Sequence, residues 1–116
     1  MDDYLRISLL HDFYGALLTE RQNEVVGLYY EENCSLAEIA GELGVSRQAV
    51  HDSLKSAVTA LTGYEEKLGL ARKFARTERV IAGIDEGLDE IIRETDDRRL
   101  AGKLEDIKKV LNGIDD

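Results

Sequence analysis

The chain has 116 residues and a formal net charge of -9, with 43% hydrophobic and 34% charged residues, no proline and one cysteine. This composition is typical of a folded, mostly helical domain, because proline breaks helix interiors and disordered chains carry too few apolar residues to form a core. A single cysteine, Cys34, and two histidines exclude an internal disulfide and give no zinc-ligand pattern. The length predicts one domain, or one domain with an appended helical piece.

The sequence carries no signal for export or for membrane insertion. Its first residues, MDDYLRISLLHDFY, are acidic where a signal peptide has a basic segment. No stretch reaches the roughly 20 apolar residues that a membrane span requires. We therefore expect a cytoplasmic protein that does not contact a membrane.

The first predicted element is a helix over residues 4–18. A row of four apolar residues lies four positions apart, with further apolar residues beside it, and this wide apolar face predicts a well-buried helix. The row is Leu5, Leu9, Phe13 and Leu17, and the flanking residues are Ile7, Leu10, Tyr14 and Leu18. Thr19 and Gln22 have the spacing of a capping box, in which each side chain bonds the other residue's backbone amide. They predict a second helix that ends within residues 31–33.

Residues 35–57 have the pattern of a helix-turn-helix. Ser35 and Glu38 form a second predicted capping box at the start of a short helix, and Ser46 caps the next helix, which we expect to run to about residue 68. A helix-turn-helix needs a small residue where its helices approach, a glycine at the turn and a branched apolar residue beyond it. Three residues satisfy this requirement at the correct spacing: Ala40, Gly44 and Val50.

The remaining residues predict two amphipathic helices joined by a short link at Asp96–Asp97 into an antiparallel hairpin. Their apolar stripes are Phe74, Ile81, Ile84, Leu88 and Ile91, then Leu100, Leu104, Ile107, Leu111 and Ile114. We divide the chain into a helix-turn-helix domain, residues 1–70, and a hairpin, residues 71–116, that packs on this domain or on a second subunit. We favour a homodimer, because these stripes together with Tyr4, Tyr14 and Tyr64 offer more apolar surface than so small a core uses.

The candidate nucleic-acid site is the outer face of the second helix of the helix-turn-helix. Arginine reads guanine and glutamine reads adenine in the major groove, and basic side chains contact phosphates. The candidate residues are Ser46, Arg47, Gln48, His51 and Lys55, with Arg21 from the preceding helix as a further phosphate contact. Asp52 opposes this function unless it accepts from a cytosine amine or pairs with Lys55.

The charge distribution also opposes nucleic-acid binding. Residues 1–70 contain five basic and twelve acidic residues, a balance of -7 in the part expected to bind duplex DNA. Affinity for a duplex comes largely from neutralised phosphates, so we expect weak binding by one copy. A basic cluster at residues 72–79 is either a second contact surface or a solvated helix face.

Three blocks in order resemble the YlxM family of small bacterial proteins: LLHDFYGALLTERQ, LYYEENCSLAEIAGELGVSRQAVHDSLK and YEEKLGL. The resemblance covers residues 1–70 closely and the remainder loosely. It implies an all-α fold similar to region 4 of sigma factors, with long C-terminal amphipathic helices. It also implies a link to the signal recognition particle pathway, through that particle's GTPase or its RNA. Sigma recognition helices tend to carry more basic residues, and no second promoter-binding domain fits in this chain.

Two functions follow, one a regulator that binds nucleic acid and the other a non-catalytic module that docks on a signal recognition particle component. Duplex DNA is the favoured ligand, since the major groove of an RNA duplex is too narrow for a helix-turn-helix. We expect no enzyme, cofactor or metal. The adjacent His11 and Asp12 lack further catalytic partners, and the scattered glycines form no phosphate-binding loop.

Overall fold

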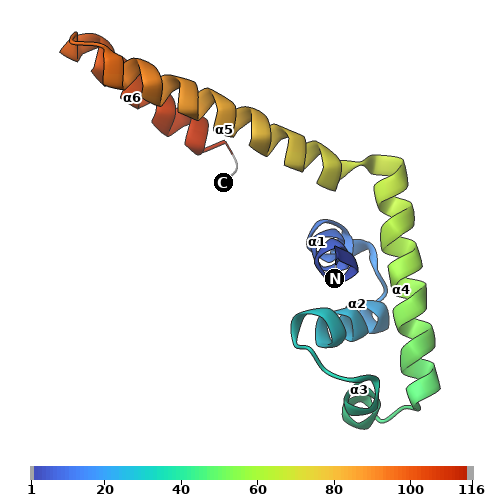
Figure 1. Cartoon of the computed structure of the whole chain (residues 1–116). Helices are drawn as coiled ribbons and strands as arrows, with labels where there is room; N and C mark the ends of the chain where they lie inside the picture. Colours follow the sequence, from blue (N-terminus) through green and yellow to red (C-terminus); the bar gives the residue numbers. More distant parts are fainter. Residues whose placement is uncertain (1, 115–116) are drawn as a thin grey trace. The chain divides into compact units, whose positions relative to one another are not determined.

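The computed structural model describes residues 2–114, which form helices and connecting turns without a strand (Figure 1). In chain order the elements are α1 (Asp2–Tyr14), the 3₁₀ helix η1 (Gly15–Leu17), α2 (Glu20–Val26), the π-helical segment η2 (Gly27–Glu31), α3 (Leu36–Leu43), α4 (Arg47–Leu68), α5 (Leu70–Glu94) and α6 (Arg98–Asn112). The chain divides into two compact units, an N-terminal unit that ends at Ala71 and a C-terminal unit that begins at Arg72. The all-α class predicted from the sequence is confirmed.

The predicted helix caps are all formed. Thr19 Oγ1 accepts a hydrogen bond from the Gln22 amide at 3.1 Å, and Gln22 Oε1 accepts one from the Thr19 amide at 2.9 Å. Ser35 and Glu38 repeat this reciprocal pair at the start of α3. The Ser35 backbone amide and hydroxyl hold the pKa of the Glu38 carboxyl below its usual value. Each box satisfies backbone amides that the first turn of a helix leaves without a partner.

The turn of the helix-turn-helix depends on a left-handed glycine. Gly44 has a φ of 69°, and the Val45 amide bonds to the Ala40 carbonyl at 3.1 Å, which closes α3. Gly69 has a φ of 61° and closes α4 in the same way, through its amide and the Glu65 carbonyl. Only glycine adopts this conformation at little cost, so both predicted helix ends are confirmed with their physical reason.

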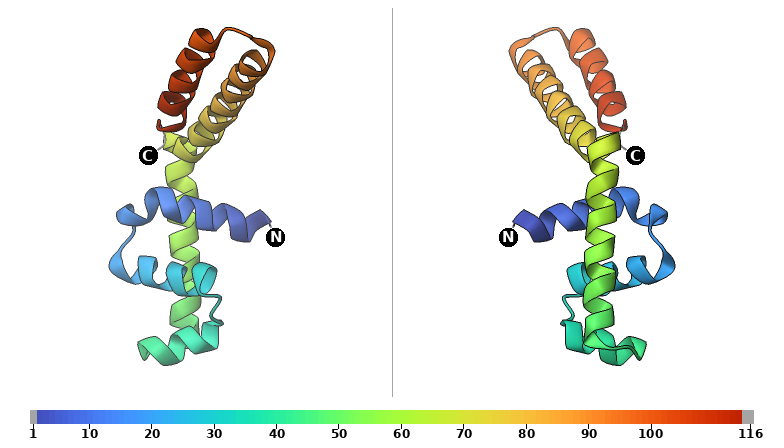
Figure 2. Two further views of the ribbon diagram at one scale, coloured as in Figure 1. Left: turned by 90° about the vertical axis from the view of Figure 1, so that its left-hand side faces the viewer. Right: turned by 90° about the vertical axis from the view of Figure 1, so that its right-hand side faces the viewer.

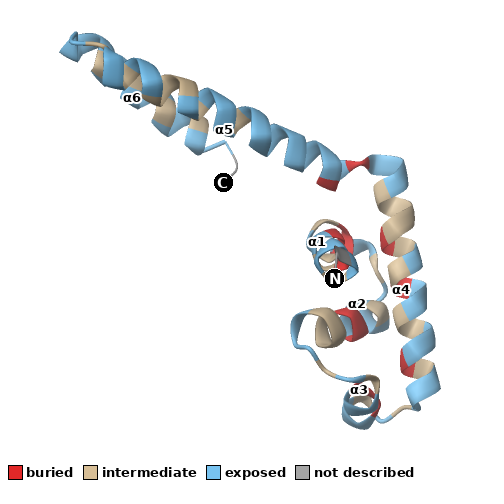
Figure 3. Cartoon of the chain, in the orientation of Figure 1, coloured by how far each residue is buried: buried red, intermediate tan, exposed pale blue. Residues whose placement is uncertain are grey.

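The N-terminal unit packs around α4, which contacts α1, α2 and α3 along its length (Figure 2). Near its start, Val50 lies in one apolar cluster with Val25, Ile39 and Ala40. Further along, Leu61 lies in a second cluster, whose other buried members are Ile7, Leu10, Tyr14 and Ala71. The buried positions of α4 all lie on the side turned towards the first three helices (Figure 3), which leaves its other side to solvent.

The predicted buried face of the first helix is confirmed for its flanking residues and wrong for most of its central row. Ile7, Leu10 and Tyr14 are buried as expected, whereas Leu5, Leu9 and Leu17 are 70%, 43% and 55% exposed. The helix also ends at Tyr14 rather than at residue 18, because the chain continues as η1. Apolar residues surround most of α1, so their spacing alone could not select the side that meets α4.

The tyrosines that we counted as surplus apolar surface pack within the N-terminal unit, with Tyr14 buried and Tyr4 and Tyr64 half-buried. Tyr14 is 1% exposed, and its hydroxyl donates to Glu65 Oε1 at 2.7 Å and accepts from the Leu70 amide at 3.0 Å. Burial and the neighbouring Glu65 raise the pKa of the Tyr14 phenol. Tyr4 and Tyr64 donate to backbone carbonyls of the same unit. The tyrosine part of our case for a homodimer is therefore wrong.

The C-terminal unit is an antiparallel pair formed by α5 and α6 (Figure 2). Lys108 of α6 forms ion pairs with Asp85 and Asp89 of α5, and Asn112 donates to Asp85 at 2.9 Å. Asp97 caps α6 by accepting from two backbone amides. Among residues 72–114 no side chain is fully buried, so the two helices leave much of their apolar surface exposed.

We expect Gly44→Ala to lower the free energy of unfolding by about 1–2 kcal/mol, because an alanine Cβ is strained at a φ of 69°. A Cβ there would meet no atom within 4 Å, so the cost is one of backbone conformation alone. Gly41→Ala is the matched control three residues earlier in α3, also with open space around it. It should raise the free energy of unfolding by about 0.5–1 kcal/mol. Urea unfolding of both variants measures the difference, and equal effects would contradict the role of the turn.

Tyr14→Phe should destabilise the protein by about 1–3 kcal/mol, because it removes a buried hydroxyl and leaves the Leu70 amide without that partner. Tyr64→Phe removes a more exposed hydroxyl bonded to the Leu17 carbonyl at 3.3 Å and should cost about 1 kcal/mol or less. Thermal unfolding followed by circular dichroism compares the two. A Tyr14→Phe variant as stable as Tyr64→Phe would show that the hydroxyl does not hold the start of α5.

Candidate nucleic-acid interface

The start of α4 carries the predicted recognition residues on its exposed side. Ser46 is the N-cap of this helix, and its Oγ accepts from the Ala49 amide at 3.0 Å. The cap begins the helix at Arg47, so the next residues lie in its first two turns, with their side chains directed away from buried Val50. In helix-turn-helix proteins this N-terminal part of the second helix faces base edges.

Three of the candidate residues meet around one hollow. Arg47, Gln48 and His51 line a space of about 300 Å³, together with Leu36 from the start of α3. All three side chains are exposed. The arrangement therefore presents a guanidinium, an amide and an imidazole on one open surface, and each of these groups can donate a hydrogen bond to a base or a phosphate.

A further basic candidate, Lys55, lies further along the same helix. Lys55 and His51 line a neighbouring hollow of about 250 Å³, whose other residues are Tyr30, Leu54, Val58 and Thr59. His51 thus belongs to both hollows. An apolar floor with one lysine at its edge can hold the stem of the lysine while the ammonium group reaches solvent or a phosphate.

Arg21 is not brought into either hollow. It lies near the start of α2, and its Nε is 3.4 Å from Glu24 Oε1 on the next turn of the same helix. Its neighbour Gln22 donates to Ser56 Oγ at 2.8 Å, which places the start of α2 against α4 beside Lys55. The Arg21 side chain is about half exposed and can reach solvent. Because it is paired with Glu24, a phosphate would have to replace that carboxylate to make contact.

Asp52 does not adopt the pairing that we considered from the sequence. We offered Lys55 as its partner, but its carboxylate accepts from Gln48 Nε2 at 3.0 Å and lies 3.6 Å from His51 Nδ1. Gln48 and Asp52 are four positions apart, and glutamine and aspartate at this spacing are known to bond on one helix face. The sequence therefore contained this signal, which sequence reasoning missed.

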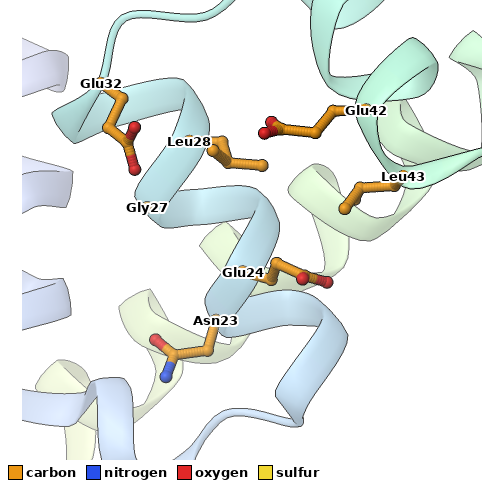
Figure 4. Close-up of a pocket in the computed structure, with 7 residues that line it drawn as sticks. All are labelled: Asn23, Glu24, Gly27, Leu28, Glu32, Glu42 and Leu43. Atoms are coloured by element: carbon orange, nitrogen blue, oxygen red, sulfur yellow. The ribbon is translucent and has the colours of Figure 1, made fainter.

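A separate hollow, of about 470 Å³, lies between α2 and α3 and is acidic (Figure 4). Its lining includes three carboxylates, Glu24, Glu32 and Glu42, together with Asn23, Gly27, Leu28 and Leu43. Charges of this sign repel phosphates, so this side of the unit is unsuited to a nucleic-acid backbone. Within residues 2–114 no group of histidine, cysteine and carboxylate side chains has the arrangement of a metal site.

His11, which we weighed for catalysis with Asp12, has structural partners instead, and the single thiol is not activated. His11 lies between Glu31, at 2.9 Å from Nδ1, and the Asn23 side chain, rather than acting with Asp12. Burial raises the pKa of the Cys34 thiol, and the carboxylates of Glu38, Glu32 and Glu42 raise it further. A thiol in these surroundings stays protonated near neutral pH and is a poor nucleophile.

None of the helices in the described part of the chain is both long enough and apolar enough to cross a bilayer.

Comparison with known proteins gives the chain a family. Residues 1–100 match the model of the UPF0122 family, described as "Putative helix-turn-helix protein, YlxM / p13 like". The chain is 51% identical over 89 residues to a UPF0122 protein of Desulforamulus reducens, which covers 77% of this chain and 76% of the relative. A UPF0122 protein of Geobacillus kaustophilus is 40% identical over 107 residues, with 84% and 97% coverage. The chain therefore belongs to the UPF0122 family of YlxM / p13-like helix-turn-helix proteins.

Proposed function

We propose that this chain is a non-catalytic regulatory protein that binds duplex DNA through the start of α4. The observation that carries the proposal is the grouping of Arg47, Gln48 and His51 around one hollow at the exposed end of the helix. Ser46 begins that helix, while Lys55 and Arg21 supply phosphate contacts. The description of the family as helix-turn-helix supports the proposal, and so does the left-handed turn at Gly44.

The charge of the N-terminal unit limits how tightly one copy binds. Few basic residues are available to displace counterions, so we expect weak and only moderately salt-dependent association. A pair of copies on one duplex doubles these contacts, and the homodimer predicted from the sequence fits this need. Such a protein acts in the cytoplasm, where duplex DNA is accessible.

A second candidate function is favoured by the acidic hollow between α2 and α3. Three carboxylates around one space suit a basic protein surface rather than a phosphate backbone. In this case the chain docks on a signal recognition particle component, of which the GTPase is the protein suggested by the resemblance. The RNA of that particle is a further ligand to compare, although a helix-turn-helix is poorly shaped for an RNA duplex.

Arg47→Ala should weaken duplex binding by about 1–3 kcal/mol if the guanidinium reads a base. Fluorescence anisotropy with labelled random duplex and with the particle's RNA, each at low and at physiological salt, measures the affinity. Arg93→Ala, which removes the same charge from an exposed position of α5 outside the basic cluster at residues 72–79, is the matched control and should have a smaller effect. Equal affinity of wild type and Arg47→Ala would remove the proposed role of α4, and failure to bind either nucleic acid would favour a protein partner.

Asp52→Asn should strengthen duplex binding by about 3- to 10-fold, because it removes a charge that repels phosphates and weakens the hold on Gln48. Glu66→Gln makes the same change in net charge near the far end of α4 and should leave the affinity almost unchanged. The same anisotropy titration applies to both variants. An increase of equal size in both would indicate a general charge effect and would contradict a local role for Asp52.

A further inference from the structure

The C-terminal unit has an apolar face that its own two helices do not cover. The half-buried residues where α5 and α6 meet include Ile81, Asp85, Leu88 and Ile92 from α5, and Ala101, Leu104, Lys108 and Leu111 from α6. Six of the large apolar side chains outside this seam are 40–73% exposed and follow one pattern: Val80, Ile84, Ile91, Leu100, Ile107 and Val110. We call these six residues the outer apolar face.

The six residues lie on one side of the hairpin. Each precedes a seam residue by one position, as Ile84 precedes Asp85 and Ile107 precedes Lys108. One position is a turn of about 100° around an α-helix. On both helices the exposed apolar residues are rotated away from the seam in the same direction about the helix axis. Because α5 and α6 are antiparallel and face each other, this rotation places the exposed apolar residues of both helices on the same face of the hairpin. The exposed apolar residues therefore form one continuous surface, large for an unpartnered one.

A stripe of α5 borders this face and has a charge pattern that is complementary to itself. Its residues are Arg76, Gly83, Gly87, Glu90 and Glu94, spaced by seven, four, three and four positions. It is basic at one end, small in the middle and acidic at the other end. The ion pairs and side-chain hydrogen bonds within residues 2–114 use neither Arg76 nor Glu94.

The two glycines have no explanation within the chain. Glycine in a helix interior is unfavourable compared with alanine. A Cβ at Gly83 or Gly87 would meet no atom within 4 Å, so nothing in this chain requires their small size. Their small size does allow the backbone of a second helix to approach closely.

We propose that a second copy of this chain covers the outer apolar face, with the two α5 helices antiparallel and the two hairpins forming a four-helix bundle. In this arrangement Arg76 of each copy lies beside Glu94 of the other, and Gly83 of each lies beside Gly87 of the other. Both pairs are centred on residue 85, since 76 and 94, like 83 and 87, average 85. The contact between the outer apolar faces, the pairs of Arg76 with Glu94 and the close approach of Gly83 to Gly87 are therefore all consistent with the same two-fold axis.

The proposal can be tested without nucleic acid, so its outcome is independent of the proposed function. Arg76 and Glu94 are 18 positions apart, about 27 Å along one helix, and cannot pair within a chain. Sedimentation equilibrium of the full chain gives the dimer dissociation constant of each variant. Arg76→Glu alone and Glu94→Arg alone should each raise this constant about 10-fold, and the double variant should restore it to within about 3-fold of wild type.

Matched controls separate this pairing from general charge effects. Arg79→Glu and Glu86→Arg make the same two charge changes on the side of α5 turned away from the outer apolar face and should alter the dissociation constant less than about 3-fold. Ile84→Asp should abolish the dimer while circular dichroism shows helices retained. A wild-type chain that is monomeric up to about 0.1 mM would overturn the proposal. A dimer that survives Ile84→Asp, or a double variant as weak as the single ones, would also overturn it.

Discussion

Every other element of the N-terminal unit depends on the unbroken apolar face of α4. This one helix supplies Val50 to one buried cluster and Leu61 to the other, so it joins the turn unit to α1. A break in it would separate the two clusters, each of which is too small to be stable alone. The absence of proline and the cap at Ser46 allow the helix to run uninterrupted to Gly69.

The same constraint determines where the candidate site lies. Since one side of α4 is buried against three helices, the polar residues of its first turns can only face solvent. The packing of α4 alone is thus enough to explain why the hydrogen-bond donors of Arg47, Gln48 and His51 are exposed. The acidic hollow between α2 and α3 lies elsewhere on the unit, and the two surfaces differ in the ligands they suit.

Sequence reasoning found the elements whose signals are local. The capping pairs at Thr19 and Ser35, the glycine at position 44 and the link at Asp96–Asp97 each depend on neighbouring residues, and all are formed as predicted. The predicted buried side of α1 was too wide because apolar residues surround this helix, and only its contact with α4 selects Ile7 and Leu10 over Leu5 and Leu9. Lys55 was expected as the partner of Asp52 because it carries the opposite charge, whereas the actual partner is the uncharged amide of Gln48. The apolar spacing of the two helices does not distinguish a hairpin whose apolar surface packs on its own chain from one whose apolar surface packs on a second subunit.

If α4 binds duplex DNA as proposed, the bond between Gln48 and Asp52 competes with that ligand. The Asp52 carboxylate already accepts a hydrogen bond from Gln48, as the acceptor edge of a base would. A duplex would have to displace this acceptor, so it gains only where it offers Gln48 a better arrangement of acceptors. One carboxylate would then set the occupancy of the site, and substitution at this single position would change that occupancy without any change in fold.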